Sequence, residues 1–142
     1  MAGTWKVKWL VVEADGERTI PALDFLRGLD KAPRTRLLQI LEAVRVSGGP
    51  HRWLDTQSHD KMEGELDDLH EVRDRHDQTL YRLYVKWDTE TSTVWILDGR
   101  TKPNKTKLAD AEYGKIRALA DLTTTDPSPE ATADDMAQLL LA

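Results

Sequence analysis

The stretch LHEVRDRHDQTLYRLYVKW, residues 69–87, constrains the fold of this chain more than any other. Polar and apolar residues alternate on both sides of a short polar turn, which is typical of a β-hairpin with one buried face. A turn over His76–Thr79 places Arg73 opposite Arg82 and Glu71 opposite Tyr84. Like charges that face each other across a sheet are unfavourable by up to about 1 kcal/mol. Some other group, either an acidic side chain or a bound anion, must therefore offset the repulsion between these two arginines.

The two faces of this hairpin differ in chemistry. The face that we expect to meet the core carries Val72, Tyr81, Leu83, Val85 and Trp87. The opposite face carries Glu71, Arg73, Arg82, Tyr84 and Lys86. A phosphate-binding face is one interpretation, because the planar fork of arginine matches a phosphate group. A solvated face whose cations are neutralised by nearby acids is the other, and the residue pattern alone leaves both open.

The rest of the pattern predicts an α+β fold. The alternation in TWKVKWLVV predicts an N-terminal strand. Two helices are expected, from about Pro21 to Leu29 with Thr19 as the cap and from about Ala32 to Val46 with Asp30 as the cap. They should form a helical hairpin packed on a small, mainly antiparallel sheet.

Further strands are expected over about 68–75, 79–88 and 92–98, and a C-terminal helix from about Ala109 to Leu122. The strand over 92–98 is apolar on both faces, so it should lie inside the sheet. Residues 48–66 are expected to form a long irregular connection. We predict one domain over residues 1–122, then an acidic linker over 123–142 that can end in a short C-terminal helix.

Composition excludes several classes of protein. The chain has 142 residues and no cysteine, which rules out disulfides and thiolate metal sites. No histidine or carboxylate spacing matches a known metal site, so no metal or other cofactor is expected. No apolar run has the length of a signal peptide or a membrane span, so we expect a cytoplasmic protein with no membrane partner.

The charges are segregated along the chain. The net charge is −5, and residues 121–142 contribute five acids and no base, so residues 1–120 are neutral as a block. Within that block, residues 60–77 hold eight acids and three bases, whereas residues 99–117 hold six bases and two acids. We expect the strand over 92–98 to end at Asp98-Gly99 and a basic loop to overhang the arginine side of the sheet. That loop carries Arg100, Lys102, Lys105 and Lys107.

Four motifs occur in order at consistent spacing: LHEVR at 69–73, YRLY at 81–84, LDG at 97–99 and TKPNKT at 101–106. With the elements around them, they resemble the RelE/ParE toxin superfamily, and within it the HigB-like (phage Gp49-like) branch. The resemblance covers residues 5 to about 120. The chain departs from the branch pattern at Arg100, where an aromatic residue is usual, and at Thr101, which replaces the first of two lysines.

The resemblance implies a RelE-like fold and the toxin component of a toxin-antitoxin system. Its activity would be that of an endoribonuclease that cleaves mRNA without a metal, in many relatives on the ribosome. A ribose 2′-OH attacks the adjacent phosphate, so the protein supplies charge stabilisation and proton transfer. The implied partners are a cognate antitoxin, mRNA and the ribosome; the oligomeric state is left open.

The resemblance also implies roles for single residues. The catalytic candidates are Arg73 and Arg82, which would clamp the phosphate, and Lys102 and Lys105, which would bind the backbone or transfer protons. The RNA-binding candidates are Tyr84, Lys86, Arg100 and Lys107. Glu71 would act as a base or orient an arginine. His76 is the one histidine worth testing as an acid or base, whereas His70 is expected to be structural.

Two alternatives stay open. A non-catalytic binding module of the same fold would act as a ParE-like gyrase inhibitor, as a decoy that binds an antitoxin, or as a phage protein reused for another contact. The acidic tail would either pair Asp134 and Asp135 with Lys102 or Lys105 and restrain the basic loop, or remain a disordered aid to solubility.

Overall fold

A computed structural model describes residues 5–46, 59–61, 69–103, 110–125 and 129–132. Its main sheet has five strands in the order β1-β7-β6-β5-β4. The strands are β1 Lys6–Trp9, β4 His59–Lys61, β5 Leu69–His76, β6 Thr79–Asp88 and β7 Thr93–Pro103. β1 is parallel to β7, and the pairs β7–β6, β6–β5 and β5–β4 are antiparallel. The mainly antiparallel sheet is therefore confirmed, with β7 in its interior as expected.

The hairpin of β5 and β6 has the register that the sequence predicts. Arg73 lies opposite Arg82, Glu71 opposite Tyr84, and His76 opposite Thr79. Its two turn residues, Asp77 and Gln78, have φ angles of 50° and 67°. Both are therefore left-handed, as in the type I′ turns whose twist matches that of the flanking strands.

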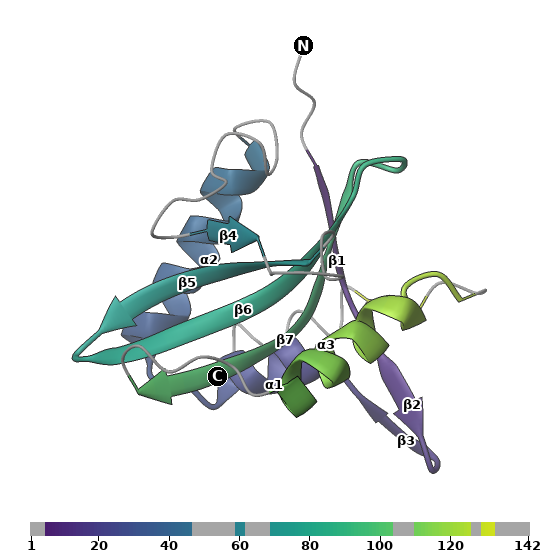
Figure 1. Cartoon of the computed structure of the whole chain (residues 1–142), viewed down its shortest axis with the longest axis horizontal. Coiled ribbons are helices and arrows are strands. Elements are labelled where there is room, and N and C mark those ends of the chain that lie inside the picture. Colours follow the sequence, from purple (N-terminus) through teal and green to yellow (C-terminus); the bar gives the residue numbers. More distant parts are fainter. Residues whose placement is uncertain (1–4, 47–58, 62–68, 104–109, 126–128, 133–142) are drawn as a thin grey trace.

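Helices cover both faces of the sheet (Figure 1). α1 Pro21–Arg27 lies against β7 and α2 Lys31–Val46 lies against β5, on one face. α3 Asp110–Leu122 packs on the opposite face. The core follows this division. One cluster joins Leu23, Leu26, Leu37 and Leu41 of α1 and α2 to Val72, Leu83 and Val85; the other joins Ile116 and Ala120 of α3 to Tyr84, Trp95 and Leu97.

The first helix begins differently from the sequence prediction. Its N-cap position is Ile20, with no side-chain cap, and Pro21 occupies the first turn. Thr19 instead ends a short strand, and its hydroxyl donates a hydrogen bond to the carbonyl oxygen of Val12 at 3.4 Å. The preorganised φ of Pro21 favours a helix start without a side-chain cap.

Three further features of the fold differ from expectation. β7 does not end at Gly99 but continues to Pro103, because Arg100, Thr101 and Lys102 pair with β6. The connection expected to be irregular contains β4, which pairs with β5 over three residues. The turn at Asp15-Gly16 joins two short strands, β2 Val12–Ala14 and β3 Glu17–Thr19, into a hairpin that projects from the main sheet (Figure 1).

Part of the C-terminal segment lies beside the end of β1 and the two residues that follow it. The backbone N–H of Val11 donates to the carbonyl of Pro129 at 2.9 Å, and the N–H of Ala131 donates to the carbonyl of Trp9 at 2.9 Å. Leu10 and Glu130 form an antiparallel bridge between these two bonds. The short helix expected near the C-terminus, and the tail acids Asp134 and Asp135, lie outside the described residues.

Of the helices that the structure describes, none is long and apolar enough to cross a membrane.

Candidate functional site

Three arginines lie side by side on three neighbouring strands. Arg73 of β5 is opposite Arg82 of β6, and Arg82 is opposite Arg100 of β7. We call these three residues the arginine row. Since neighbouring strands are about 5 Å apart, the row spans about 10 Å across the sheet. An array of guanidinium groups at this spacing is suited to an extended anion with several oxygen atoms.

Two carboxylates flank the arginine row. Glu71 and Asp98 occupy the next same-face positions on β5 and β7, on either side of Tyr84. Glu71 contacts Arg73, Nη1 to Oε1, at 2.8 Å, and Arg82, Nε to Oε2, at 3.9 Å. Asp98 accepts a hydrogen bond from Arg100, Nη1 to Oδ2, at 2.5 Å. Three positive and two negative charges make the set +1 in total, which explains how facing arginines are tolerated.

The row is partly buried. The side chain of Arg82 is 10% exposed, whereas those of Arg73 and Arg100 are 24% and 27% exposed. It lies on the face that carries α3, but α3 contacts the sheet around Tyr84, Trp95 and Leu97, farther from the β5–β6 turn (Figure 1). The central arginine is thus nearly enclosed, whereas the outer two keep about a quarter of their side-chain surface exposed.

The local shape of β7 places Arg100 in the row. The pairing with β6 shifts between Tyr84 and Val85, so that Leu97 is an extra residue in β7. Beyond this bulge, Gly99 lies opposite Leu83, on the face that α1 covers. A Cβ atom at Gly99 would overlap the ring of Phe25 from α1, so only glycine fits. The close approach at Gly99 is thus made by a helix of this chain.

Two of the predicted RNA-binding residues have structural roles here. Tyr84 is completely buried in the cluster under α3, so its ring is not exposed to RNA in this structure. The Lys86 ammonium donates to the Thr123 hydroxyl at 2.9 Å and to the Ala120 carbonyl at 3.5 Å. Lys86 thus anchors the C-terminal end of α3, where a positive charge is favourable.

The basic residues after Gly99 divide into two groups. Arg100 and Lys102 belong to β7, with Lys102 in register with Leu80. The loop expected to overhang the sheet therefore starts later than the sequence suggested. Lys105, Lys107 and the side chain of Lys102 lie outside what the structure describes.

The histidines of the hairpin lie away from the arginine row. His76 alternates with Arg75 along β5, which puts it on the opposite face. It is exposed, with Nε2 at 3.5 Å from Oδ2 of Asp77. A role for His76 beside the arginines is therefore not supported. His70 is buried, as expected of a structural histidine.

Sequence reasoning missed Asp98, the partner of Arg100. The signal was present, because Asp98, Arg100 and Lys102 alternate with uncharged residues, which is the pattern of a strand. The sequence prediction ends the strand at Gly99, between Asp98 and Arg100. The glycine is required by the Phe25 ring, a contact that local sequence does not reveal.

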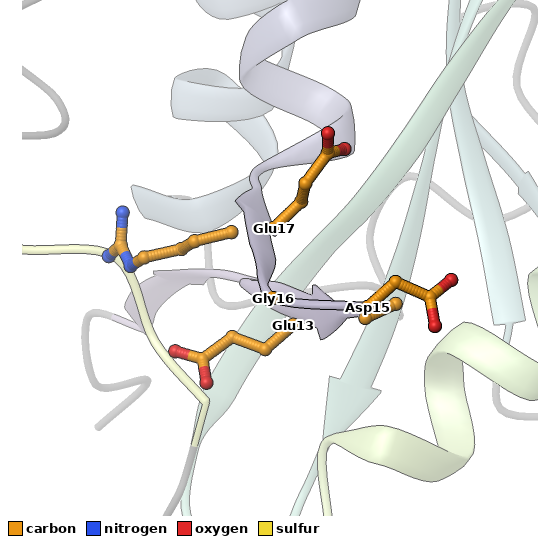
Figure 2. A pocket seen from close by; sticks show the side chains of 6 residues that line it. Glu13, Asp15, Gly16 and Glu17 are labelled. Atoms are coloured by element: carbon orange, nitrogen blue, oxygen red, sulfur yellow. The ribbon is translucent and has the colours of Figure 1, made fainter.

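A hollow of about 310 Å³ lies at the β2–β3 hairpin and is lined by residues Glu13–Arg18. Figure 2 shows that the carboxylates of Glu13, Asp15 and Glu17 point in different directions. Polar groups that do not converge cannot surround a ligand, so this hollow is not the functional site. Among the described residues, no group of three or more histidine, aspartate or glutamate side chains is placed to hold a metal ion.

The architecture defines a RelE-like α+β fold. The structural similarity that shows this is with the toxin RelE of E. coli, in a free-state form with two arginines replaced by alanine. The TM-score is 0.51 at 17% sequence identity, over 87% of this chain and 100% of that one. Comparison with protein-family profiles gives no match for the chain, and neither does comparison with curated protein sequences. At this level of identity the similarity concerns the fold, and assignment to the HigB-like branch stays a prediction.

Proposed function

We propose that the chain is the toxin component of a toxin-antitoxin system, of the HigB-like branch, and that it cleaves mRNA as a metal-independent endoribonuclease. The observation that carries this proposal is the arginine row, with its three cations in register on neighbouring strands. The likeness in fold to the toxin RelE supports it. A cognate antitoxin, mRNA and the ribosome are the partners that this function requires.

The proposed reaction uses the substrate's own nucleophile. The ribose 2′-OH loses its proton and its oxygen attacks the adjacent phosphorus, while the 5′-oxygen of the next nucleotide leaves and takes up a proton. The products are a 2′,3′-cyclic phosphate and a 5′-hydroxyl. Arg73 and Arg82 stabilise the added negative charge of the phosphorane, as preorganised donors do in other phosphate chemistry. We assign the proton transfers to Lys102 and Lys105, and further backbone binding to Arg100 and Lys107.

Glu71 fits an orienting role better than that of a base. Its two oxygens contact Arg73 and Arg82, so both are engaged with cations of the row. Glu71 thus holds the two arginines in register.

The test is induced expression of the chain and of its variants Arg73→Ala and Arg82→Gln, with mRNA ends mapped in parallel. Arg82 is buried, so glutamine replaces it to limit the loss of packing, and circular dichroism checks that each variant folds. Arg36→Ala is the matched control, because Arg36 lies on α2 with a side chain that is 56% exposed. We expect growth arrest and new mRNA ends for wild type and Arg36→Ala, and neither for the two row variants.

One observation favours a second candidate, a non-catalytic binding module of the same fold. The two flanking carboxylates leave the row with a single net positive charge, and its central arginine is buried. In that case induction arrests growth without new mRNA ends, which points to a protein target such as DNA gyrase. The absence of both arrest and cleavage, in cells that lack the antitoxin, would contradict the toxin proposal altogether.

A further inference from the structure

Asp98 uses both of its carboxylate oxygens within a three-residue segment of β7. Oδ1 accepts the backbone N–H of Gly99 at 2.8 Å, and Oδ2 accepts Nη1 of Arg100 at 2.5 Å. The same Nη1 also donates to the carbonyl of Gly99 at 2.7 Å. The Asp98 side chain is only 13% exposed, so its contact with Arg100 is shielded from solvent.

This segment is itself fixed from both faces of the sheet. The extra residue of the bulge, Leu97, is completely buried in the cluster under α3. Two residues later, Gly99 is closed from the other side by the Phe25 ring of α1. Because both neighbours of Asp98 are held in this way, its carboxylate has a defined position, and so does the arginine that it binds.

We propose that Asp98 is a positioning residue for RNA cleavage, which holds Arg100 in the arginine row so that this arginine binds an RNA phosphate as the third phosphate-binding group. The inference rests on the proposed function. A guanidinium group has five N–H donors, so Arg100 can keep its Nη1 on Asp98 and still present other donors to a phosphodiester. The pair thus acts as one unit, with Asp98 setting the geometry and Arg100 making the contact.

This arrangement predicts opposite effects on binding and on rate. A carboxylate beside a bound phosphate repels it, so loss of the Asp98 charge should strengthen RNA binding. Without Asp98, however, Arg100 is no longer held, and a misplaced catalytic contact costs rate. A residue that only stabilised the bulge would produce no such split.

The experiment compares the full chain with Asp98→Asn, which keeps an oxygen for the Gly99 N–H but removes the charge. Cleavage is measured as the rate of appearance of new ends on a reporter mRNA in a translation extract. Binding is measured by fluorescence anisotropy on an RNA whose 2′-OH groups are methylated, so that it cannot react. Asp121→Asn is the matched control, because it removes one acid from an exposed position on α3.

For Asp98→Asn we expect cleavage to slow by about 10- to 100-fold, while the Kd for the methylated RNA stays the same or falls. Asp121→Asn should change neither the rate nor the Kd by more than a factor of about 2. In the background of Arg100→Gln, the Asp98→Asn change should have little further effect on rate, because residues that act as one unit are not additive.

Two results would overturn the inference. One is an equal loss of rate from Asp98→Asn with and without Arg100, and the other is a wild-type rate in the single variant. If the proposed ribonuclease function itself is wrong, the result is different, because the wild-type chain would then neither cleave the reporter nor bind the methylated RNA. A thermal melt of each variant separates loss of the fold from loss of the pair.

Discussion

At the scale of single residues, substitution of two glycines by alanine should change the free energy of unfolding in opposite directions. Gly99→Ala should lower the free energy of unfolding by about 1–3 kcal/mol, because its new Cβ overlaps the Phe25 ring and overpacking has this cost. Gly114→Ala is the matched change, since nothing lies within 4 Å of a Cβ at this exposed position of α3. It should raise the free energy of unfolding by about 0.5–1 kcal/mol through helix propensity.

Urea unfolding followed by circular dichroism measures both changes. Equal effects of the two substitutions would show that Phe25 does not occupy the space over Gly99. If Gly99→Ala destabilises the chain for the stated reason, the added change Phe25→Ala should cost less than it does alone, because the two sites share one space.

The turn between β5 and β6 carries a second prediction at this scale. Gln78 has a φ of 67°, in the left-handed region that glycine tolerates best. Gln78→Gly should therefore raise the free energy of unfolding by about 0.5–1 kcal/mol, after the greater freedom of glycine in the unfolded chain is allowed for. Gln39→Gly, at an exposed position of α2, should lower it by about 1 kcal/mol. Thermal unfolding distinguishes them, and a fall in Tm for Gln78→Gly would contradict the turn geometry.

Residue pairing was the part of the fold that the sequence predicted best. A period of two and a tight polar turn leave one register for β5 and β6, so Arg73 and Arg82 could be placed opposite each other without a structure. Burial was predicted less well. Tyr84 and Arg82 share a face with charged residues, and their burial depends on what packs over that face. The alternation of polar and apolar residues within a strand does not reveal that α3, from a later part of the chain, packs over this face.

At the scale of elements, the position of α3 depends on Lys86. The Lys86 ammonium and the Thr123 hydroxyl together bind the carbonyl of Ala120, at the end of the helix. Lys86→Met keeps the length of the side chain but removes this donor. It should lower the free energy of unfolding by about 1 kcal/mol and speed hydrogen exchange at the C-terminal end of α3. Lys6→Met, at an exposed position of β1, is the control and should change neither.

The exchange should be measured residue by residue. Faster exchange limited to the last turn of α3 would support the anchoring role of Lys86. Unchanged exchange in α3, with a wild-type free energy of unfolding, would mean that apolar packing of Ile116 and Ala120 alone holds the helix.

Element boundaries show where sequence reasoning stops. The pattern predicted α1, α2, α3, β5 and β6 close to their observed positions, because each has a clear period or a strong end signal. It ended β7 too early, at a glycine whose purpose is contact with α1. It also left out β4, whose three residues are too few for a period to appear. Glu71, Arg73 and Arg82 of the candidate site followed from the hairpin alone. The pairing of Arg100 and Asp98 needed the true length of β7.

At the scale of the whole molecule, the C-terminal segment adds backbone pairing at the end of β1, the outer strand of the main sheet. Two backbone hydrogen bonds join residues 129–132 to Trp9, the last residue of β1, and to Val11 just beyond it. Ala131 adds its side chain to the core cluster under α1 and α2. Glu130 pairs with Lys8 at 2.8 Å, but both side chains are more than 30% exposed, so this ion pair contributes at most about 1 kcal/mol. The acidic segment is thus held mainly by its backbone rather than by its charge.

A truncation series tests this arrangement. A chain that ends at Thr125 should lose about 1–3 kcal/mol of the free energy of unfolding, because two net hydrogen bonds are removed. It should also associate as its concentration rises, since an uncovered edge strand presents unpaired N–H and C=O groups to other chains. A chain that ends at Thr132 keeps both hydrogen bonds and is the matched control, and Glu130→Gln in the full chain isolates the ion pair. Urea unfolding and light scattering are the measurements. If the chain that ends at Thr125 is as stable and as monodisperse as the one that ends at Thr132, the segment does not protect this edge.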